Sequence, residues 1–148
     1  MLDIKRRGYF PRGGGKVVLS MPHTPGPLPS FTLTSRGDVI AIKGRAYVAG
    51  TLPLHIATRM AHAATAQLIA SGYHRGLIDI RPGHENDKDA GNGSGIILWA
   101  ETEGSCVIAG SAIGSKGIDA GQTGKDAAME LVRNLEHGGC VDEYLQVL

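Results

Sequence analysis

The chain has 148 residues, of which 42% are hydrophobic and 20% charged, and its formal net charge at pH 7 is +1. This composition is typical of a globular domain and excludes a disordered chain, and the balanced charge gives no whole-chain basic footprint for nucleic acid. No stretch approaches the roughly 18 apolar residues of a membrane span, and residues 1–5 do not begin a signal peptide because no apolar segment follows. We therefore expect a soluble, intracellular protein without membrane contact.

The N-terminal part is predicted to be extended. Residues 1–21 read as an extended piece, a glycine turn and the strand-like run 16–21, and no pairing partner for that run is evident nearby. Four prolines follow between residues 22 and 29. Because proline disfavours both helix and ladder pairing, this stretch is predicted to be a linker or an edge crossing.

Residues 38–50 show the alternation of a strand. Ile40 and Ile42 are predicted to share one face, with Lys43 on the other, and Gly44 is predicted to be a bulge. Three further apolar runs, 77–80, 96–100 and 106–109, are predicted strands, and the last two are expected to pair as an antiparallel hairpin.

Two helices are predicted. The first covers residues 53–71 and ends at Gly72, and the second covers 120–136, with Asp119 and Gln122 as a capping box. Each has an apolar stripe with helical spacing. The expected fold is α+β, a small sheet of about four strands with two helices on one face. The stripes consist of Ala57, Met60, Ala61, Ala64 and Leu68 in the first helix, and Gly124, Ala127, Ala128, Leu131 and Leu135 in the second.

Residues with reactive side chains form no evident active site in the sequence. The six histidines show no metal-ligand spacing, and we expect His55 and His62 to lie on the solvent side of their helix. Residues 85–89 are acidic but lack the final Glu of a calcium loop, so a solvated turn is expected there, with a flexible continuation over 91–95. Cys106 and Cys140 lack a CxxC spacing, which favours free thiols in a reducing compartment.

The most distinctive motif is Arg7-Gly8-Tyr9-Phe10-Pro11-Arg12-Gly13-Gly14-Gly15-Lys16-Val17. Three consecutive glycines permit positive φ and the close approach of a backbone, a phosphate or a ligand. A strand-like run follows, whereas a phosphate loop leads into a helix N-terminus, so the motif is not a P-loop. Two interpretations of the motif are left: a turn with a structural role, or a turn that contacts a ligand.

This motif resembles the signature of the RNA 3'-terminal phosphate cyclase family, which Arg7, Gly8, Pro11, Gly13, Gly14, Gly15 and Val17 fit. The stretches 36–37, 44–50, 91–95, 109–111 and 137–145 also resemble eukaryotic-type members. The resemblance implies a thioredoxin-like insert domain at 36–137. Residues 1–35 would end a repeated βαβ-type core unit and its Pro-rich linker, and 138–148 would begin a truncated core helix.

The resemblance also implies a function. Family members use ATP and a divalent metal such as Mg²⁺ to convert an RNA 3'-phosphate into a 2',3'-cyclic phosphodiester through an adenylyl-histidine, and adenylation supplies a leaving group. The family histidine would fall beyond Leu148, so this chain would be a partial, inactive form with no catalytic or metal-binding residue of its own. Tyr144 matches a nucleotide-contacting residue, and Arg7 and Arg12 are candidate RNA contacts.

Three alternatives follow from this. The chain is a piece of a nuclear RNA-processing ligase, a noncatalytic cyclase-like scaffold in ribosomal RNA processing, or a plain structural module. RNA 3'-phosphate ends are the implied partner in the first case. A missing core would leave an apolar face exposed and favour self-association.

Overall fold

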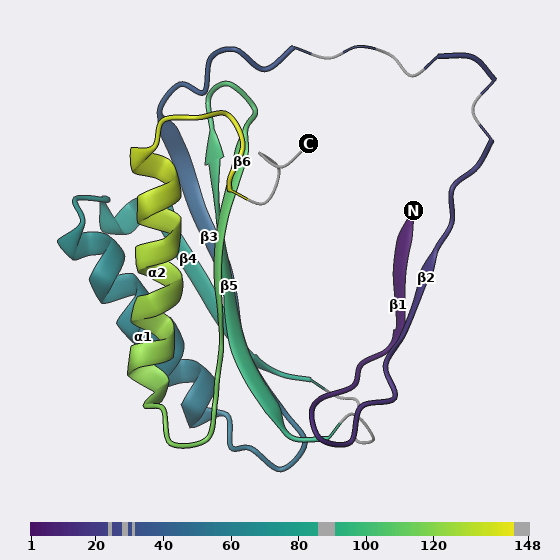
Figure 1. Cartoon of the computed structure of the whole chain (residues 1–148). Helices are drawn as coiled ribbons and strands as arrows, with labels where there is room; N and C mark the ends of the chain where they lie inside the picture. Colours follow the sequence, from purple (N-terminus) through teal and green to yellow (C-terminus); the bar gives the residue numbers. More distant parts are fainter. Residues whose placement is uncertain (24, 28–29, 31, 86–90, 144–148) are drawn as a thin grey trace.

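The computed structural model describes residues 1–23, 25–27, 30, 32–85 and 91–143. Within them lie two sheets and two long helices, which confirms the α+β class (Figure 1). In chain order the elements are β1 (Leu2–Arg6), β2 (Lys16–Leu19), β3 (Val39–Ala49), α1 (His55–Ala70), a 3₁₀ turn (Arg75–Leu77), β4 (Ile78–His84), β5 (Gly93–Thr102), β6 (Val107–Ile113) and α2 (Ala120–Glu136).

The main sheet has four strands in the order β4-β3-β5-β6. β3 pairs in parallel with β4 and antiparallel with β5, and β5 and β6 form the expected antiparallel hairpin. Both helices cover the same face of this sheet (Figure 1). The opposite face carries no helix among the described residues.

The core lies between the helices and the covered face of the sheet, and the predicted stripes supply its helical side. All ten stripe residues are buried. On the sheet side, Ile42, Ala46, Val48, Ile96, Leu98 and Ile108 are each at most 1% exposed. Alternation along the strands leaves their neighbours on the open face.

The boundaries of α2 come from local chemistry. The Asp119 side chain accepts a hydrogen bond from the Gly121 N–H at 2.7 Å, as an N-cap residue does. Of the expected capping box, the bond from the Gln122 N–H to the Asp119 side chain is present, while the Gln122 side-chain amide donates to Asp126 Oδ1 at 2.7 Å. Gly138 has φ +80° just beyond the helix, a conformation that glycine adopts readily.

Two expectations for β3 are wrong for one reason. The irregularity in its pairing with β5 lies between Val39 and Ala41, so Ile40 is turned outward and is 52% exposed. Gly44 stays in register opposite Leu98 and Ile80. A Cβ there would lie 2.5 Å from Leu98 Cδ2, so this glycine makes room for a core side chain.

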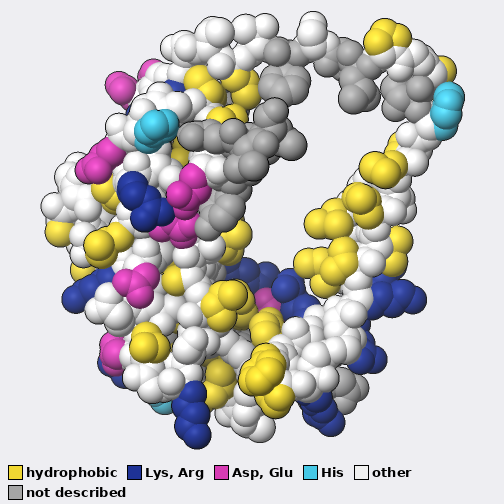
Figure 2. All heavy atoms as spheres, in the orientation of Figure 1, with side chains coloured by type: hydrophobic (Ala, Val, Ile, Leu, Met, Phe, Trp, Pro, Cys, Tyr) yellow, Lys and Arg dark blue, Asp and Glu magenta, His cyan; other side chains and the backbone are white. Residues whose placement is uncertain are grey.

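The N-terminal segment differs from the expectation as well. The strand at 16–19 does have a partner, because β1 pairs antiparallel with β2, for example Ile4 with Val17. This hairpin stands apart from the main sheet and presents apolar side chains to the space between them (Figures 1 and 2). Leu2, Ile4, Val17 and Leu19 are 49–65% exposed. Burial of such a surface requires a further partner.

Two other expectations concern the loop before β5 and the C-terminal end. Residues 93–95 begin β5 and are not a flexible loop. Asn92 Oδ1, just before them, accepts a hydrogen bond from the Thr51 N–H at 2.8 Å. Residues 140–142 are irregular and Glu143 lies in a turn, while 144–148 lie outside the described residues, so the expected helix stays a prediction.

No helix in the described part of the chain is long and apolar enough to cross a membrane. The expected division at residues 35 and 137, and the assignment of the flanks to a repeated core, stay predictions.

Candidate functional site

The motif at residues 7–17, here called the signature turn, folds back on itself between β1 and β2. Gly13 and Gly14 have φ +61° and +77°, a region that other residues rarely adopt. The Gly13 N–H donates to the Tyr9 carbonyl at 2.8 Å. A Cβ on Gly8 would lie 2.5 Å from both the Gly13 carbonyl oxygen and the Gly15 nitrogen. The glycines are therefore required by the shape of the turn itself.

Aromatic packing joins the signature turn to the end of the main sheet. The Tyr9 ring lies against Gly93 at the start of β5, where a Cβ would overlap it. Its centroid is 6.2 Å from that of Tyr47 on β3, in a tilted arrangement. Burial is the main reason that the pKa of each phenol is raised above its ordinary value. Both phenols are accordingly neutral at physiological pH.

Ion pairs reinforce the same contact. Glu85, which directly follows β4, receives Arg7 Nε at 3.0 Å and Arg45 Nη2 at 2.8 Å. The Glu85 side chain is only 11% exposed, whereas the two arginine side chains are 41% and 52% exposed. Two guanidinium groups thus lie against one carboxylate at this corner. Figure 2 shows Lys and Arg side chains around the turn at the lower right.

A groove of about 970 Å³ lies beside the signature turn, between the turn, the first part of α1 and the loop before α2. Its walls include Phe10, which is 92% exposed, and its floor includes Ile56 and Met60. Arg59 and Asp119 pair across one side at 2.5 Å. The groove therefore has an apolar floor with a charged border, and the signature turn forms one of its walls.

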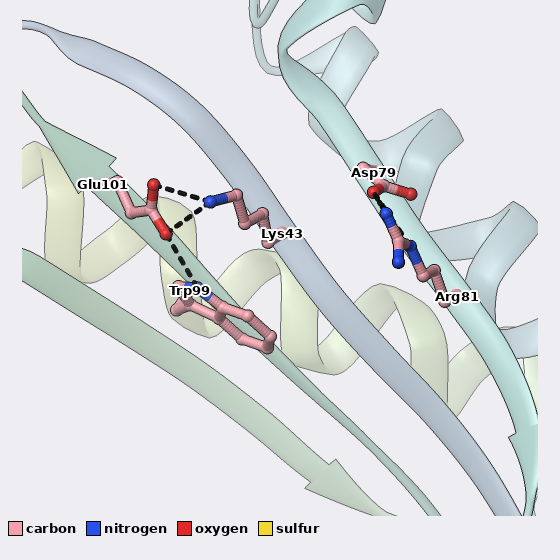
Figure 3. Close-up of polar contacts among 5 residues, drawn as sticks. All are labelled: Lys43, Asp79, Arg81, Trp99 and Glu101. Carbon is pink, nitrogen blue, oxygen red and sulfur yellow. Dashed lines mark hydrogen bonds and ion pairs between the residues drawn. The ribbon is translucent and has the colours of Figure 1, made fainter.

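The open face of the main sheet has paired charges (Figure 3). Lys43 Nζ binds both carboxylate oxygens of Glu101, at 2.7 and 2.8 Å, and Trp99 Nε1 donates to Oε1 at 3.4 Å. The bond from Lys43 is the main reason that the pKa of Glu101 is lowered. Arg81 pairs with Asp79 at 2.6 Å, which lowers the pKa of Asp79 and raises that of Arg81. Lys43 and Arg81 are thus each paired with a carboxylate on this face.

The structure thus brings Arg7, Gly8, Pro11 and the three glycines together in one turn, while their role stays a prediction. Tyr144 lies outside the described residues. His55 and His62 are exposed on α1. No group of three His, Cys, Asp or Glu side chains suited to a metal ion occurs among the residues that the structure describes.

Sequence reasoning missed the partners of the turn. Glu85 was expected to be part of a solvated acidic loop, yet its carboxylate is largely buried between two arginines. Tyr47 and Gly93 lie far from Tyr9 along the chain, and only the fold brings them together. A local signal for such a contact was present in the sequence. Tyr9 precedes a proline and glycines, in a turn too polar to bury an aromatic ring by itself, which indicates that the ring packs against another part of the fold.

Comparisons with known proteins agree on one family. The family model described as "RNA 3'-terminal phosphate cyclase (RTC), insert domain" matches residues 34–136. Curated proteins named RNA 3'-terminal phosphate cyclase match almost the whole chain. That of Hyperthermus butylicus is 36% identical over 95% of this chain and 39% of its own length. That of Ignicoccus hospitalis is 37% identical over 97% of this chain and 40% of its own length. That of Pyrococcus abyssi is 34% identical over 97% of the chain and 40% of its own length. The chain thus spans about two fifths of the length of these relatives.

Proposed function

The chain belongs to the RNA 3'-terminal phosphate cyclase family, and from this membership we propose that it works within an RNA 3'-phosphate cyclase. The single observation that carries the proposal is the match of 95% or more of the chain to proteins of that name, signature turn included. The proposed reaction is the ATP-dependent conversion of an RNA 3'-phosphate into a 2',3'-cyclic phosphodiester. The proposed partner is an RNA end that carries a 3'-phosphate.

The part that this chain supplies is architectural. It contains the signature turn and holds it on the insert domain through Glu85 and through the Tyr9–Tyr47 contact. Two arginines lie at this corner, and guanidinium groups favour an approaching RNA phosphate. We infer that Glu85 sets the positions of Arg7 and Arg45 beside the turn.

The catalytic part of the reaction is proposed to lie outside this chain. The resemblance places the family histidine beyond Leu148, and Tyr144, the expected nucleotide contact, lies outside the described residues. The chain by itself is therefore proposed to form no adenylyl-histidine. Incubation with ATP labelled at the α-phosphate and with Mg²⁺ should leave the protein unlabelled, and an acid-labile covalent label would contradict this.

A chimera tests the family function directly. Residues 1–143 of this chain replace the matching segment of the Hyperthermus butylicus relative, and the product is assayed on an RNA oligonucleotide with a labelled 3'-phosphate. Protection of that phosphate from phosphatase, dependent on ATP, supports the proposal. A folded chimera without activity contradicts it, and binding of the chain to ribosomal precursor particles would favour the scaffold alternative.

Two further properties belong to the proposal. The exposed apolar side chains of β1 and β2 are proposed to mediate self-association when no other partner covers them. Light scattering over a range of concentrations tests this, and a monomer at all concentrations would contradict it. A nuclear site of action is also proposed, and microscopy of the tagged protein in its own cells tests it.

A further inference from the structure

β6 is an edge strand of the main sheet, and its backbone groups alternate between β5 and the edge. The Thr102 N–H donates to the Cys106 carbonyl at 3.1 Å, and the Gly114 N–H donates to the Ser94 carbonyl at 2.9 Å. The pairing of β5 with β6 has no irregularity between these two bonds. Even-numbered residues therefore face β5, and odd-numbered residues direct their N–H and C=O groups outward. Such outward groups are a template for another strand.

Helix α2 crosses β6 at very short distance. The point of contact is Gly110, where a Cβ would lie 2.5 Å from the Leu131 nitrogen and 2.7 Å from the Ala127 carbonyl oxygen. A glycine at this place in the strand lets the helix backbone approach closely. Side chains on either side of Leu131 can therefore reach the edge of β6.

Two side chains of α2 bind outward backbone groups of β6. The Ser111 N–H donates to Glu130 Oε2 at 2.6 Å. Asn134 Nδ2 donates to the Ala109 carbonyl at 3.0 Å, and Asn134 is only 6% exposed. Positions 130 and 134 are four residues apart and lie on the same face of the helix. One turn of α2 thus supplies an acceptor and a donor to the middle of the edge.

The opposite edge of the sheet, β4, has its own protection in its sequence. It contains Pro82, which has no N–H for a further strand, and the charged side chains of Asp79 and Arg81. β6 contains neither proline nor a charged residue, and its Val107 and Ile113 are 55% and 80% exposed. An apolar edge of this kind depends on another element to cover it.

We propose that Glu130 and Asn134 close the β6 edge to a second copy of the chain. Without these contacts, β6 pairs antiparallel with β6 of that copy about a two-fold axis. Centred on position 110, this pairing places Val107 opposite Ile113 of the partner subunit, so that the exposed apolar side chains cover one another. This inference goes beyond the proposed function and does not depend on it.

Hydrogen exchange of the Ser111 amide in dilute protein tests the contact itself. Glu130→Ala should speed that exchange at least about tenfold, because a hydrogen bond to a charged acceptor is lost. Glu130→Gln keeps an acceptor oxygen and should restore most of the protection. Glu136→Ala is the matched control, since it removes the same charge from an exposed position of α2. Unchanged Ser111 exchange in folded Glu130→Ala would overturn the proposal.

Sedimentation equilibrium tests the consequence for association. Glu130→Ala and Asn134→Ala should each dimerise at least about tenfold more tightly than wild type, whereas Glu136→Ala should match wild type. Association through β1 and β2 contributes equally to all of these proteins. Circular dichroism confirms the fold of each variant, and Glu130→Asp, with a side chain one carbon shorter, replaces Glu130→Ala if that variant does not fold.

A proline on the edge identifies the surface that pairs. The Ala109 N–H points outward, so Ala109→Pro removes no bond to β5 but blocks an added strand. Combined with Glu130→Ala, it should return dimerisation to the wild-type level. A tighter dimer that persists in this double variant would overturn the proposal. Equal association of Glu130→Ala and Glu136→Ala would overturn it as well.

Discussion

Replacement of Glu85 by glutamine should release the signature turn from the main sheet while the core stays folded. The change removes the negative charge that binds both Arg7 and Arg45, at 3.0 and 2.8 Å, and keeps the size of the side chain. The Glu85 carboxylate pairs with arginines of the turn and of β3, and neither arginine belongs to the buried stripes of α1 and α2. The loss should therefore fall on the docking of the turn and not on global unfolding.

The magnitude follows from the geometry. Exposed ion pairs contribute about 0.2–1 kcal/mol each, and the low exposure of Glu85 favours the upper part of that range. Only the Arg7 pair joins the turn to the main sheet, because Arg45 itself lies on β3, so the loss is about 0.5–1 kcal/mol, a factor of about 2–5 in the population of the undocked turn. Arg45→Gln keeps the Arg7 pair and should leave that population nearly unchanged.

Limited proteolysis measures that population. Trypsin cleaves after Arg12 only when the turn is open, so under conditions of rapid reclosing the cleavage rate follows the undocked fraction. Asp79→Asn is the matched control, because it breaks an ion pair within β4, the strand that Glu85 follows, and this pair does not involve the turn. If Glu85→Gln and wild type are cut after Arg12 at the same rate, the reasoning is refuted.

Other changes test the core, the aromatic contact and the helix cap. Leu131→Ala, at a fully buried position, should lower the free energy of unfolding in urea by about 2–5 kcal/mol. Met129→Ala on the same helix, at a position that is 55% exposed, should lower it by less than about 0.5 kcal/mol. Equal losses would contradict the described packing. Gly93→Val should displace the Tyr9 ring and raise trypsin cleavage after Arg12, and an unchanged rate would show that the ring does not pack there. The pKa of Asp119 is lowered, chiefly by the Gly121 N–H, so its stabilising effect is complete above its unfolded pKa of about 3.9 and is lost as pH falls through the folded value. Asp119→Asn should therefore differ most from wild type above about pH 5 and converge with it in acid, and a difference that grows in acid would contradict this sign.

Local signals explain why the helices could be predicted from the sequence. The bounds predicted for α2, 120–136, agree with the structure because a capping aspartate precedes it and a glycine with positive φ follows it. The stripe of α1 could be read for the same reason, since helical spacing needs no knowledge of distant residues.

Long-range pairing explains the errors. A glycine within a strand indicates either a bulge or a close approach, and only the position of Leu98 shows that Gly44 serves the second purpose. The pairing of β1 with β2 was missed because a long turn separates two very short strands. The partners of the signature turn depend on the register of β3 and β4, which no local pattern reveals.

The central place of β3 has a consequence for how the protein acquires its shape. β3 is the earliest strand of the main sheet, yet its neighbours β4 and β5 come only after α1 and after residue 92. During synthesis, neither edge of β3 can therefore form its hydrogen bonds to a neighbouring strand until most of the domain has left the ribosome. Such non-local pairing slows folding, and it makes this apolar strand the segment that a chaperone would most usefully shield.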